Sequence, residues 1–129
     1  VCGRVSVTMF EHLDEMLVAF DKAEPDGGDA ESTAAPANLF TVNQDCEKLS
    51  EEKAVAFHNI VAKTLFVTKR ARPDACAPIS FPTSRVREPD KDDWKKMVHL
   101  MRCIRGTLRS ALGLSADGTH ILKGWVDAS

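Results

Sequence analysis

The sequence predicts a mainly helical α+β fold with three principal helices, a short N-terminal strand and a C-terminal β-hairpin. Three separate stretches repeat apolar residues at spacings of three and four, which is typical of amphipathic helices. Short apolar or β-branched runs stand near both ends of the chain, as expected for strands. The composition, 129 residues with 43% hydrophobic and 28% charged, fits one small globular domain.

Residues 1–21 predict a strand followed by a helix. Residues 5–9 (VSVTM) are rich in β-branched side chains and alternate between apolar and polar. Apolar residues then recur at helical spacing from Phe10 to Phe20, with acids early in the helix, where the helix dipole favours them. We expect one short strand and a helix of two to three turns.

Residues 22–49 predict a flexible acidic linker. The stretch contains prolines, two adjacent glycines and several acids, and its few apolar side chains bury too little surface to offset chain ordering. Residues 39–42 are expected to form a short extended segment that docks after the linker.

Residues 50–109 predict a helical region that begins at Ser50, a good N-cap residue with acids behind it. The first helix of this region is apolar on most sides, and its apolar residues include Val55 and Phe66. We therefore expect it to be the central and most buried helix. It carries cations at its C-terminal end, Lys69 and Arg70, where the dipole favours them.

The segment after Pro73 is interrupted by Pro78 and Pro82. An interior proline removes a backbone hydrogen bond and costs about 3 kcal/mol in a continuous helix. We therefore expect a broken helix or two short turns over residues 75–86.

Asp90 with Asp93 resembles a capping box, which places a helix start at this point. An apolar stripe follows from Trp94 to Leu108, and it makes this helix the best specified element of the chain. Trp94 is expected to be a core anchor, and Gly106 to terminate the helix.

Residues 110–129 predict a β-hairpin, because two apolar runs, 111–114 and 121–126, flank Asp117 and Gly118. Asp-Gly between apolar runs is a strong hairpin signal.

Charge is segregated along the chain although the net charge is only −2. Residues 1–62 carry four Lys/Arg and twelve Asp/Glu, whereas residues 63–109 carry twelve Lys/Arg and five Asp/Glu. Such segregation indicates that the basic region faces either a polyanion or the acidic part of its own chain. A solvated helix face of mixed sign is the alternative.

The four cysteines contain no C-x-x-C pair, and we expect free thiols. His99 and Cys103 are four residues apart on one expected helix, but no second pair is spaced to complete the four ligands of a structural zinc site.

Several motifs, taken in order, resemble the Pol polyprotein of copia-type LTR retrotransposons. Residues 57–63 and 69–74 resemble the helix and Arg-Pro-Asp turn of its reverse transcriptase, and residues 84–96 resemble its Ser-Arg…Pro…Trp segment. Residues 100–107 (LMRCIRGT) resemble its Leu-Arg-Tyr-Leu-Lys-Gly-Thr signature, and residues 125–128 fall where its RNase H domain begins. The chain departs from the family at Cys103, usually an aromatic, at Asp93, often a His, and at the two prolines in a helical segment.

The resemblance implies a fragment that runs from the strand and helix after the polymerase palm, through a thumb-to-connection region, to the start of RNase H. Both ends of the chain are expected to be cuts within a longer polyprotein. Asp127 would be the first RNase H carboxylate and a ligand of Mg²⁺ in the intact parent enzyme. One carboxylate cannot hold two metal ions, so we expect no cofactor and no catalysis in the isolated chain. Read without the family, Asp127 is a solvated acid at a strand end.

The same resemblance implies that basic side chains of the helical region grip the backbone of an RNA–DNA template–primer. Such contacts are directed at phosphates, ignore base sequence and weaken with salt. The candidate residues are Lys69, Arg70, Arg72, Arg85, Lys95, Lys96, Arg102 and Arg105, with Arg87 and Arg109 in the same basic cluster.

Structural roles compete with this interpretation at several of these cations. Arg72 could pair with Asp74 or cap backbone carbonyls, and Arg102 and Arg105 could merely complement a helix dipole. The alternatives for the whole chain are a stand-alone nucleic-acid-binding module and a protein-interaction domain whose basic stripe pairs with its own acidic half. We expect the other Pol domains and nucleic acid as partners, no membrane, and an intracellular location.

Overall fold

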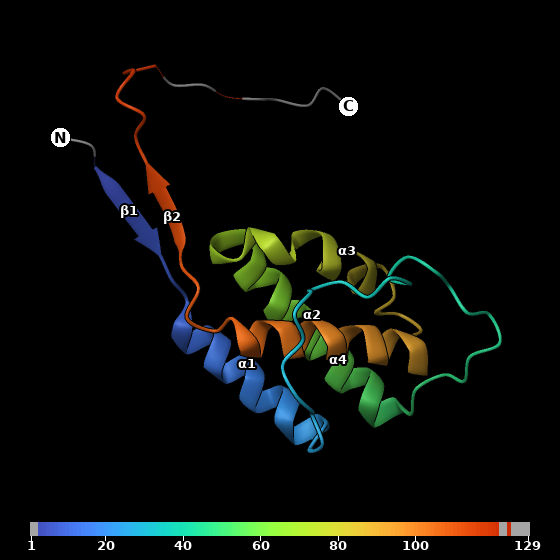
Figure 1. Cartoon of the computed structure of the whole chain (residues 1–129). Coiled ribbons are helices and arrows are strands. Elements are labelled where there is room, and N and C mark those ends of the chain that lie inside the picture. Colours follow the sequence, from blue (N-terminus) through green and yellow to red (C-terminus); the bar gives the residue numbers. More distant parts are fainter. Residues whose placement is uncertain (1–2, 122–123, 125–129) are drawn as a thin grey trace.

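The computed structural model describes residues 3–121 and 124 of the chain. Figure 1 shows a body of helices from which a two-stranded ribbon projects. The element order is β1 (Arg4–Val7), α1 (Phe10–Ala23), α2 (Glu51–Ala71), the 3₁₀ turn η1 (Pro73–Ala75), α3 (Cys76–Ser84), α4 (Lys91–Gly106) and β2 (Leu112–Ser115). The predicted mainly α class with minor β is confirmed, and α1, α2 and α4 are the three principal helices. In the part of the chain described, no helix is long and apolar enough to cross a bilayer.

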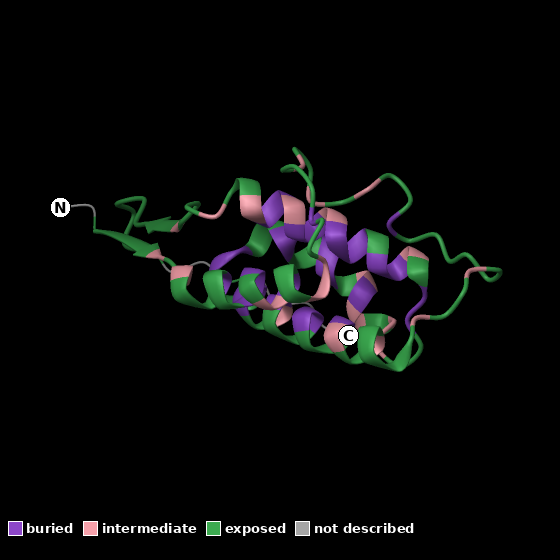
Figure 2. Ribbon diagram, turned by 90° about the horizontal axis from the view of Figure 1, so that it is seen from below, coloured by how far each residue is buried: buried purple, intermediate pink, exposed green. Residues whose placement is uncertain are grey.

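The helices contact one another in a ring. α1 packs on α2, α2 on α3 and α3 on α4, while α4 also contacts α1 and α2. Figure 2 shows the buried residues gathered between these helices, with the ribbon almost wholly exposed. The largest fully buried side chains come from all four helices and include Phe20, Phe57, Ile79, Met97 and Met101.

The most buried helix is α4, which corrects the prediction for α2. Nine of the 16 residues of α4 are buried, compared with seven of the 21 residues of α2. Two apolar residues of α2 that were expected inside, Val55 and Phe66, are 57% and 42% exposed. α2 is central in that it contacts all three other helices, but one of its faces remains in solvent.

Both predicted helix starts are confirmed. The Ser50 side chain accepts a hydrogen bond from the backbone N–H of Lys53. At α4, Asp90 accepts from the backbone N–H of Asp93, and Asp93 accepts from that of Asp90, which completes the capping box. Trp94 is 6% exposed and belongs to the core, as predicted.

The prolines do not break the segment after α2, so the expected interruption is wrong. α3 runs over nine residues, with Pro82 inside it. Pro78 lies in its first turn, where backbone N–H groups have no partner within the helix, so this proline removes no helical bond. Pro78 and Pro82 are both buried, and their packing against the core offsets the hydrogen bond that Pro82 removes.

α4 ends at Gly106, as predicted, although this glycine does not adopt a left-handed conformation. It is the last helical residue, and the positive-φ glycines among the described residues are Gly28 and Gly118. A Cβ added at Gly106 would lie 2.9 Å from the Cβ of Ala30. The glycine therefore allows residues 24–49 to approach the helix closely.

The first two residues of the predicted linker, 22–49, belong to α1. Residues 24–49 contain no helix or strand, but they pack against the helical body. Leu39 is 4% exposed, and the ring of Phe40 packs edge-on against Phe81 of α3. Turns surround Leu39, whose N–H donates to the carbonyl of Pro36, so the extended segment expected at residues 39–42 is wrong. Near α4 the backbone N–H of Leu49 donates to the carbonyl of Pro89.

The strand partner of the C-terminal segment differs from the prediction. β2 pairs antiparallel with β1, and Val5 lies opposite Leu114. Gly118 forms a bend with a φ of 76°, but the second run of the predicted hairpin lies largely outside the described residues. Because Val5 and Leu114 are 59% and 52% exposed, the ribbon presents an apolar pair to solvent.

Candidate nucleic-acid interface

The eight cations predicted to contact nucleic acid fall into two groups. One group forms ion pairs within the chain, and its members are Arg72, Arg85, Lys96, Arg102 and Arg105. The other group is exposed and forms no ion pair with any residue that the structure describes; its members are Lys69, Arg70 and Lys95. The predicted cluster is thus not one continuous basic face.

Arg72 joins the C-terminal ends of α2 and α4. Its guanidinium donates to both carboxylate oxygens of Asp74, and it also donates to the carbonyl and the hydroxyl of Thr107 at 3.0 and 2.7 Å. The side-chain hydrogen bond from Arg72 lowers the pKa of the Asp74 carboxyl below its usual value. Arg72 is 3% exposed and has the structural role that was the alternative to nucleic-acid contact.

Arg85 joins the end of α3 to the start of α4. Its guanidinium donates to the carboxylates of Asp93 at 3.0 Å and Asp90 at 3.3 Å, both of which are buried. These contacts, led by the hydrogen bond to Asp93, raise the pKa of Arg85. The cation offsets two buried negative charges that the capping box brings together, so it supports the N-terminus of α4.

Lys96 is enclosed between α4, α3 and residues 24–49. Its ammonium lies 2.8 Å from the Asp92 carboxylate, donates to the carbonyl of Thr41 at 2.5 Å and sits 4.6 Å from the centre of the Phe81 ring. Its side chain is 2% exposed, so it does not reach a ligand on the surface in this conformation.

Arg102 and Arg105 bind the acidic part of the chain. Arg105 pairs with Asp21 of α1, and Arg102 lies 4.0 Å from Glu31 while donating to the carbonyl of Gly27 at 2.5 Å. A Cβ at Gly28 would fall 2.4 Å from the Arg102 guanidinium, and the φ of Gly28 is +73°. The adjacent glycines that suggested flexibility are where the acidic segment closes on α4.

Residues 24–49 also follow the exposed side of α4 beyond these arginines. Lys91 pairs with Glu47 at 2.5 Å, and His99 lies within 3.9 Å of Glu31 and 3.3 Å of the Thr33 hydroxyl. Carboxylates from the acidic half therefore occupy positions beside basic side chains of α4. On this face of α4, basic side chains pair with acids of the same chain, which is one of the interpretations given for the charge segregation.

Two of the cations that remain exposed, Lys69 and Arg70, are neighbours at the end of α2. Arg70 donates to the carbonyl of Phe66, and its guanidinium lies 3.7 Å from the centre of the Phe66 ring. Lys69 is its exposed neighbour, while Lys95 is exposed in the first half of α4. Arg87 and Arg109 are also exposed and form no ion pair with a residue in the described ranges.

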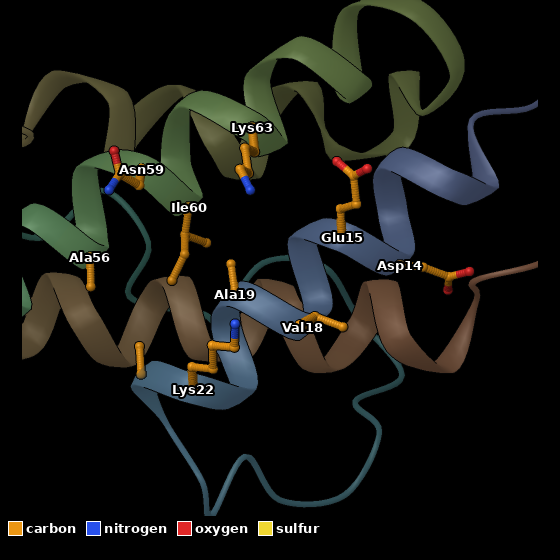
Figure 3. A pocket seen from close by; sticks show the side chains of 10 residues that line it. Asp14, Glu15, Val18, Ala19, Lys22, Ala56, Asn59, Ile60 and Lys63 are labelled. Atoms are coloured by element: carbon orange, nitrogen blue, oxygen red, sulfur yellow. The ribbon is translucent and has the colours of Figure 1, made fainter.

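A shallow groove of about 680 Å³ follows the seam between α1 and α2. Figure 3 shows Glu15 and Lys63 reaching from opposite helices over the same part of this seam. Val18 lies on its α1 side and is 54% exposed. A second groove of about 390 Å³ adjoins the first, since Glu15 and Lys63 line both.

No cluster of three or more His, Cys, Asp or Glu side chains able to hold a metal ion occurs in residues 3–121 or at residue 124. His99 contacts Glu31 and Thr33, and Cys103 is buried, where desolvation raises the pKa of its thiol. Asp127, the predicted Mg²⁺ ligand of the intact parent enzyme, lies outside the described residues.

Sequence reasoning offered Asp74 as a partner of Arg72, but it did not identify the distant residues that contact the arginines. Asp21 is 84 residues from Arg105, and Glu31 is 71 residues from Arg102. Thr107 is 35 residues from Arg72. The opposite charges of the two halves were the available signal, but they did not specify which residues pair.

Comparisons with protein-family models, with curated proteins and with solved structures found no match to this chain.

Proposed function

We propose that the chain is a helical segment of a copia-type Pol polyprotein that binds the backbone of an RNA–DNA template–primer and has no catalytic role alone. A contact between two of the motifs that carry the resemblance supports this proposal. Arg72 of the Arg-Pro-Asp turn donates to the carbonyl and the hydroxyl of Thr107, which belongs to the motif of residues 100–107 and is 35 residues away.

This contact matters because motif residues that hold a fold together should recur in a family even where the surface varies. It joins residues of two motifs at the junction of α2 with α4.

The exposed cations carry the binding part of the proposal. Lys69 and Arg70 stand together at the end of α2, and Lys95 is available on α4. Arg72 and Lys96 are left out of the proposed surface because they are buried and bound within the chain.

The test is binding of the chain to a labelled RNA–DNA hybrid, measured by fluorescence anisotropy over a salt series. Each lost phosphate contact should reduce the slope of log K against log salt by about 0.9, so Lys69→Ala with Arg70→Ala should reduce it by about 1.8. The matched control, Lys22→Ala with Lys48→Ala, removes two cations elsewhere and should leave the slope unchanged. Affinity that ignores salt would contradict a phosphate-gripping role.

Absence of catalysis is tested with the same hybrid. We expect no polymerisation and no cleavage in Mg²⁺, because one RNase H carboxylate cannot position two metal ions. Metal-dependent cleavage by the pure chain that Asp127→Asn abolishes would overturn this part of the proposal.

A protein-interaction domain is the second candidate, favoured by the pairs that Arg105 and Arg102 form with Asp21 and Glu31. Exposed ion pairs weaken as salt screens them. Thermal stability that falls in high salt, together with no binding to the hybrid, would favour this candidate over the first.

A further inference from the structure

The outer face of α1 carries an acid and a base at equal distances on either side of an exposed valine. Val18 is 54% exposed, although it lies inside the helix. Asp14 is four residues before it and Lys22 is four residues after it. Residues four apart are neighbours on one side of an α-helix, so these three side chains form a row. Figure 3 shows Val18 between Asp14 and Lys22 along α1.

The chain provides no charged partner for this row among the residues that the structure describes. Asp14, Val18 and Lys22 are all exposed, and the ion pairs of the described residues include neither Asp14 nor Lys22. Asp21 on the same helix differs, because it pairs with Arg105 of α4. The row can therefore contact a molecule outside the chain.

The surface beside the row allows another helix to approach. The groove of about 680 Å³ between α1 and α2 is lined by Val18 together with Ala19 and Ala56, whose side chains are small. The distance between packed helices depends on the size of the side chains at the contact, so alanines permit a close approach. Glu15 and Lys63 line the groove from opposite helices but form no ion pair within the described part of the chain.

The row is complementary to itself. A second copy of α1 that lies antiparallel across the first at Val18 presents the same residues in reverse order. Val18 then meets Val18, and Asp14 of each copy lies opposite Lys22 of the other. A two-fold axis repeats every contact, so the pattern gives two ion pairs. A helix of another protein would need a matching row of base, apolar residue and acid, whereas a second copy has one already.

A like-charge contact in this arrangement is offset within the chain. Glu15 is three residues before Val18 and Asp21 is three residues after it, so Glu15 of one copy lies near Asp21 of the other. Arg105 pairs with Asp21 and offsets its charge. The net electrostatic effect of the contact is therefore set mainly by Asp14 and Lys22.

We propose that two copies of the chain associate through α1, antiparallel and centred on Val18. The 14 residues of α1 span about 21 Å. A contact between helices of this length falls below the roughly 1,200–2,000 Å² of a stable interface, so we expect a weak dimer with a dissociation constant of tens of micromolar, about −6 kcal/mol. The inference is independent of the proposed nucleic-acid function, because it uses neither Lys69 nor Arg70.

Sedimentation equilibrium of the full chain, at about 1 to 300 μM, covers the expected affinity. A reducing agent excludes dimers linked through the exposed thiol of Cys76. Val18→Glu places two carboxylates against each other on the two-fold axis and should weaken association about tenfold or more. Val55→Glu is the matched control, because Val55 is a helical valine of similar exposure, 57%, that does not line the groove. It should leave the dissociation constant unchanged.

Charge reversal tests the antiparallel register. Asp14→Lys and Lys22→Glu each turn both ion pairs into repulsive pairs, so either variant alone should associate about tenfold more weakly. An equimolar mixture of the two variants again places opposite charges at both contacts and should associate like the original chain. The double variant should do the same. A thermal melt followed by circular dichroism establishes that each variant is folded.

The outcomes decide the proposal directly. Weaker association of each single variant with recovery in the mixture supports it. A chain that remains monomeric throughout this concentration range overturns it. Association that Val18→Glu leaves intact also overturns it and places the contact on another surface, such as the exposed Val5 and Leu114 of the ribbon. A mixture that associates no better than either variant alone overturns the antiparallel arrangement.

Discussion

Arg72 decides how two helix ends meet. Its guanidinium supplies donors in a planar fork, and the structure uses them on the Asp74 carboxylate and on Thr107, the C-cap of α4. A helix C-terminus leaves carbonyls without a partner, so a buried cation placed there satisfies one of them and complements the dipole. A lysine has the same charge, but it cannot reproduce this arrangement.

Arg72→Lys should therefore lower the free energy of unfolding by about 2 kcal/mol, since hydrogen bonds to charged groups contribute about 1.5–3 kcal/mol each. Urea unfolding followed by circular dichroism measures the change. Arg70→Lys is the control, because Arg70 is exposed and has no ion pair among the described residues; it should change stability by less than about 0.5 kcal/mol. Equal effects of the two variants would contradict the junction role of Arg72.

The cysteines should differ in reactivity because only the thiolate is an effective nucleophile. Cys76 is exposed, whereas Cys103 is 6% exposed and its burial raises the pKa of its thiol. With iodoacetamide at neutral pH, mass spectrometry should detect modification of Cys76 first, and of Cys103 only after denaturant is added. Comparable rates in the native chain would show that Cys103 is accessible.

At the scale of elements, α4 depends on its first turn. The capping box brings the carboxylates of Asp90 and Asp93 together in a buried position, and Arg85 arrives from the end of α3 to offset their charge. The isolated bridge between Lys48 and Asp90 adds the end of the acidic segment to the same place. Asp90 thus caps α4 and also contacts the end of α3 and the end of residues 24–49.

Asp90→Ala should destabilise the chain by about 1–2 kcal/mol through the lost cap. Loss of the ion pair with Arg85 should add to this effect. Asp90→Asn is the matched variant, because asparagine caps a helix as well as aspartate but carries no charge. We expect Asp90→Asn to lose less stability in urea unfolding. If both variants lost the same amount, the cap hydrogen bond would contribute little beside the ion pair.

For the whole molecule, residues 24–49 form part of the packed body. They bury Leu39, supply the carbonyls that bind Arg102 and Lys96, and place carboxylates beside Lys91 and His99. The acidic half of the chain thereby offsets charge that would otherwise accumulate on α4. The free surface for a polyanion is reduced to the end of α2 and a few separate cations.

Leu39→Ala tests whether this packing is coupled to the stability of the helices. Removing a buried leucine side chain costs about 2–5 kcal/mol, and we expect the lower end because the site lies at the margin of the core. Urea unfolding measures the loss, and limited proteolysis should cut residues 24–49 faster in the variant. An unchanged unfolding midpoint with the same cleavage rate would show that this segment folds independently of the helices.

The sequence by itself determined the fold class and the positions of the three principal helices. Ser50, the pair Asp90 and Asp93, and the stripe that begins at Trp94 predicted their structural roles correctly. Caps and apolar periodicity act between residues a few positions apart, so a local pattern contains the interaction that stabilises it.

Only the tertiary structure decided which faces are buried and which charges remain free. α4 is more buried than α2, β2 pairs with β1, and Arg102 and Arg105 bind acids far away in the sequence. Each outcome depends on which segments come together after the chain folds back on itself. Periodicity shows that a helix has an apolar face or a basic side chain, but the partner is set by packing between distant segments.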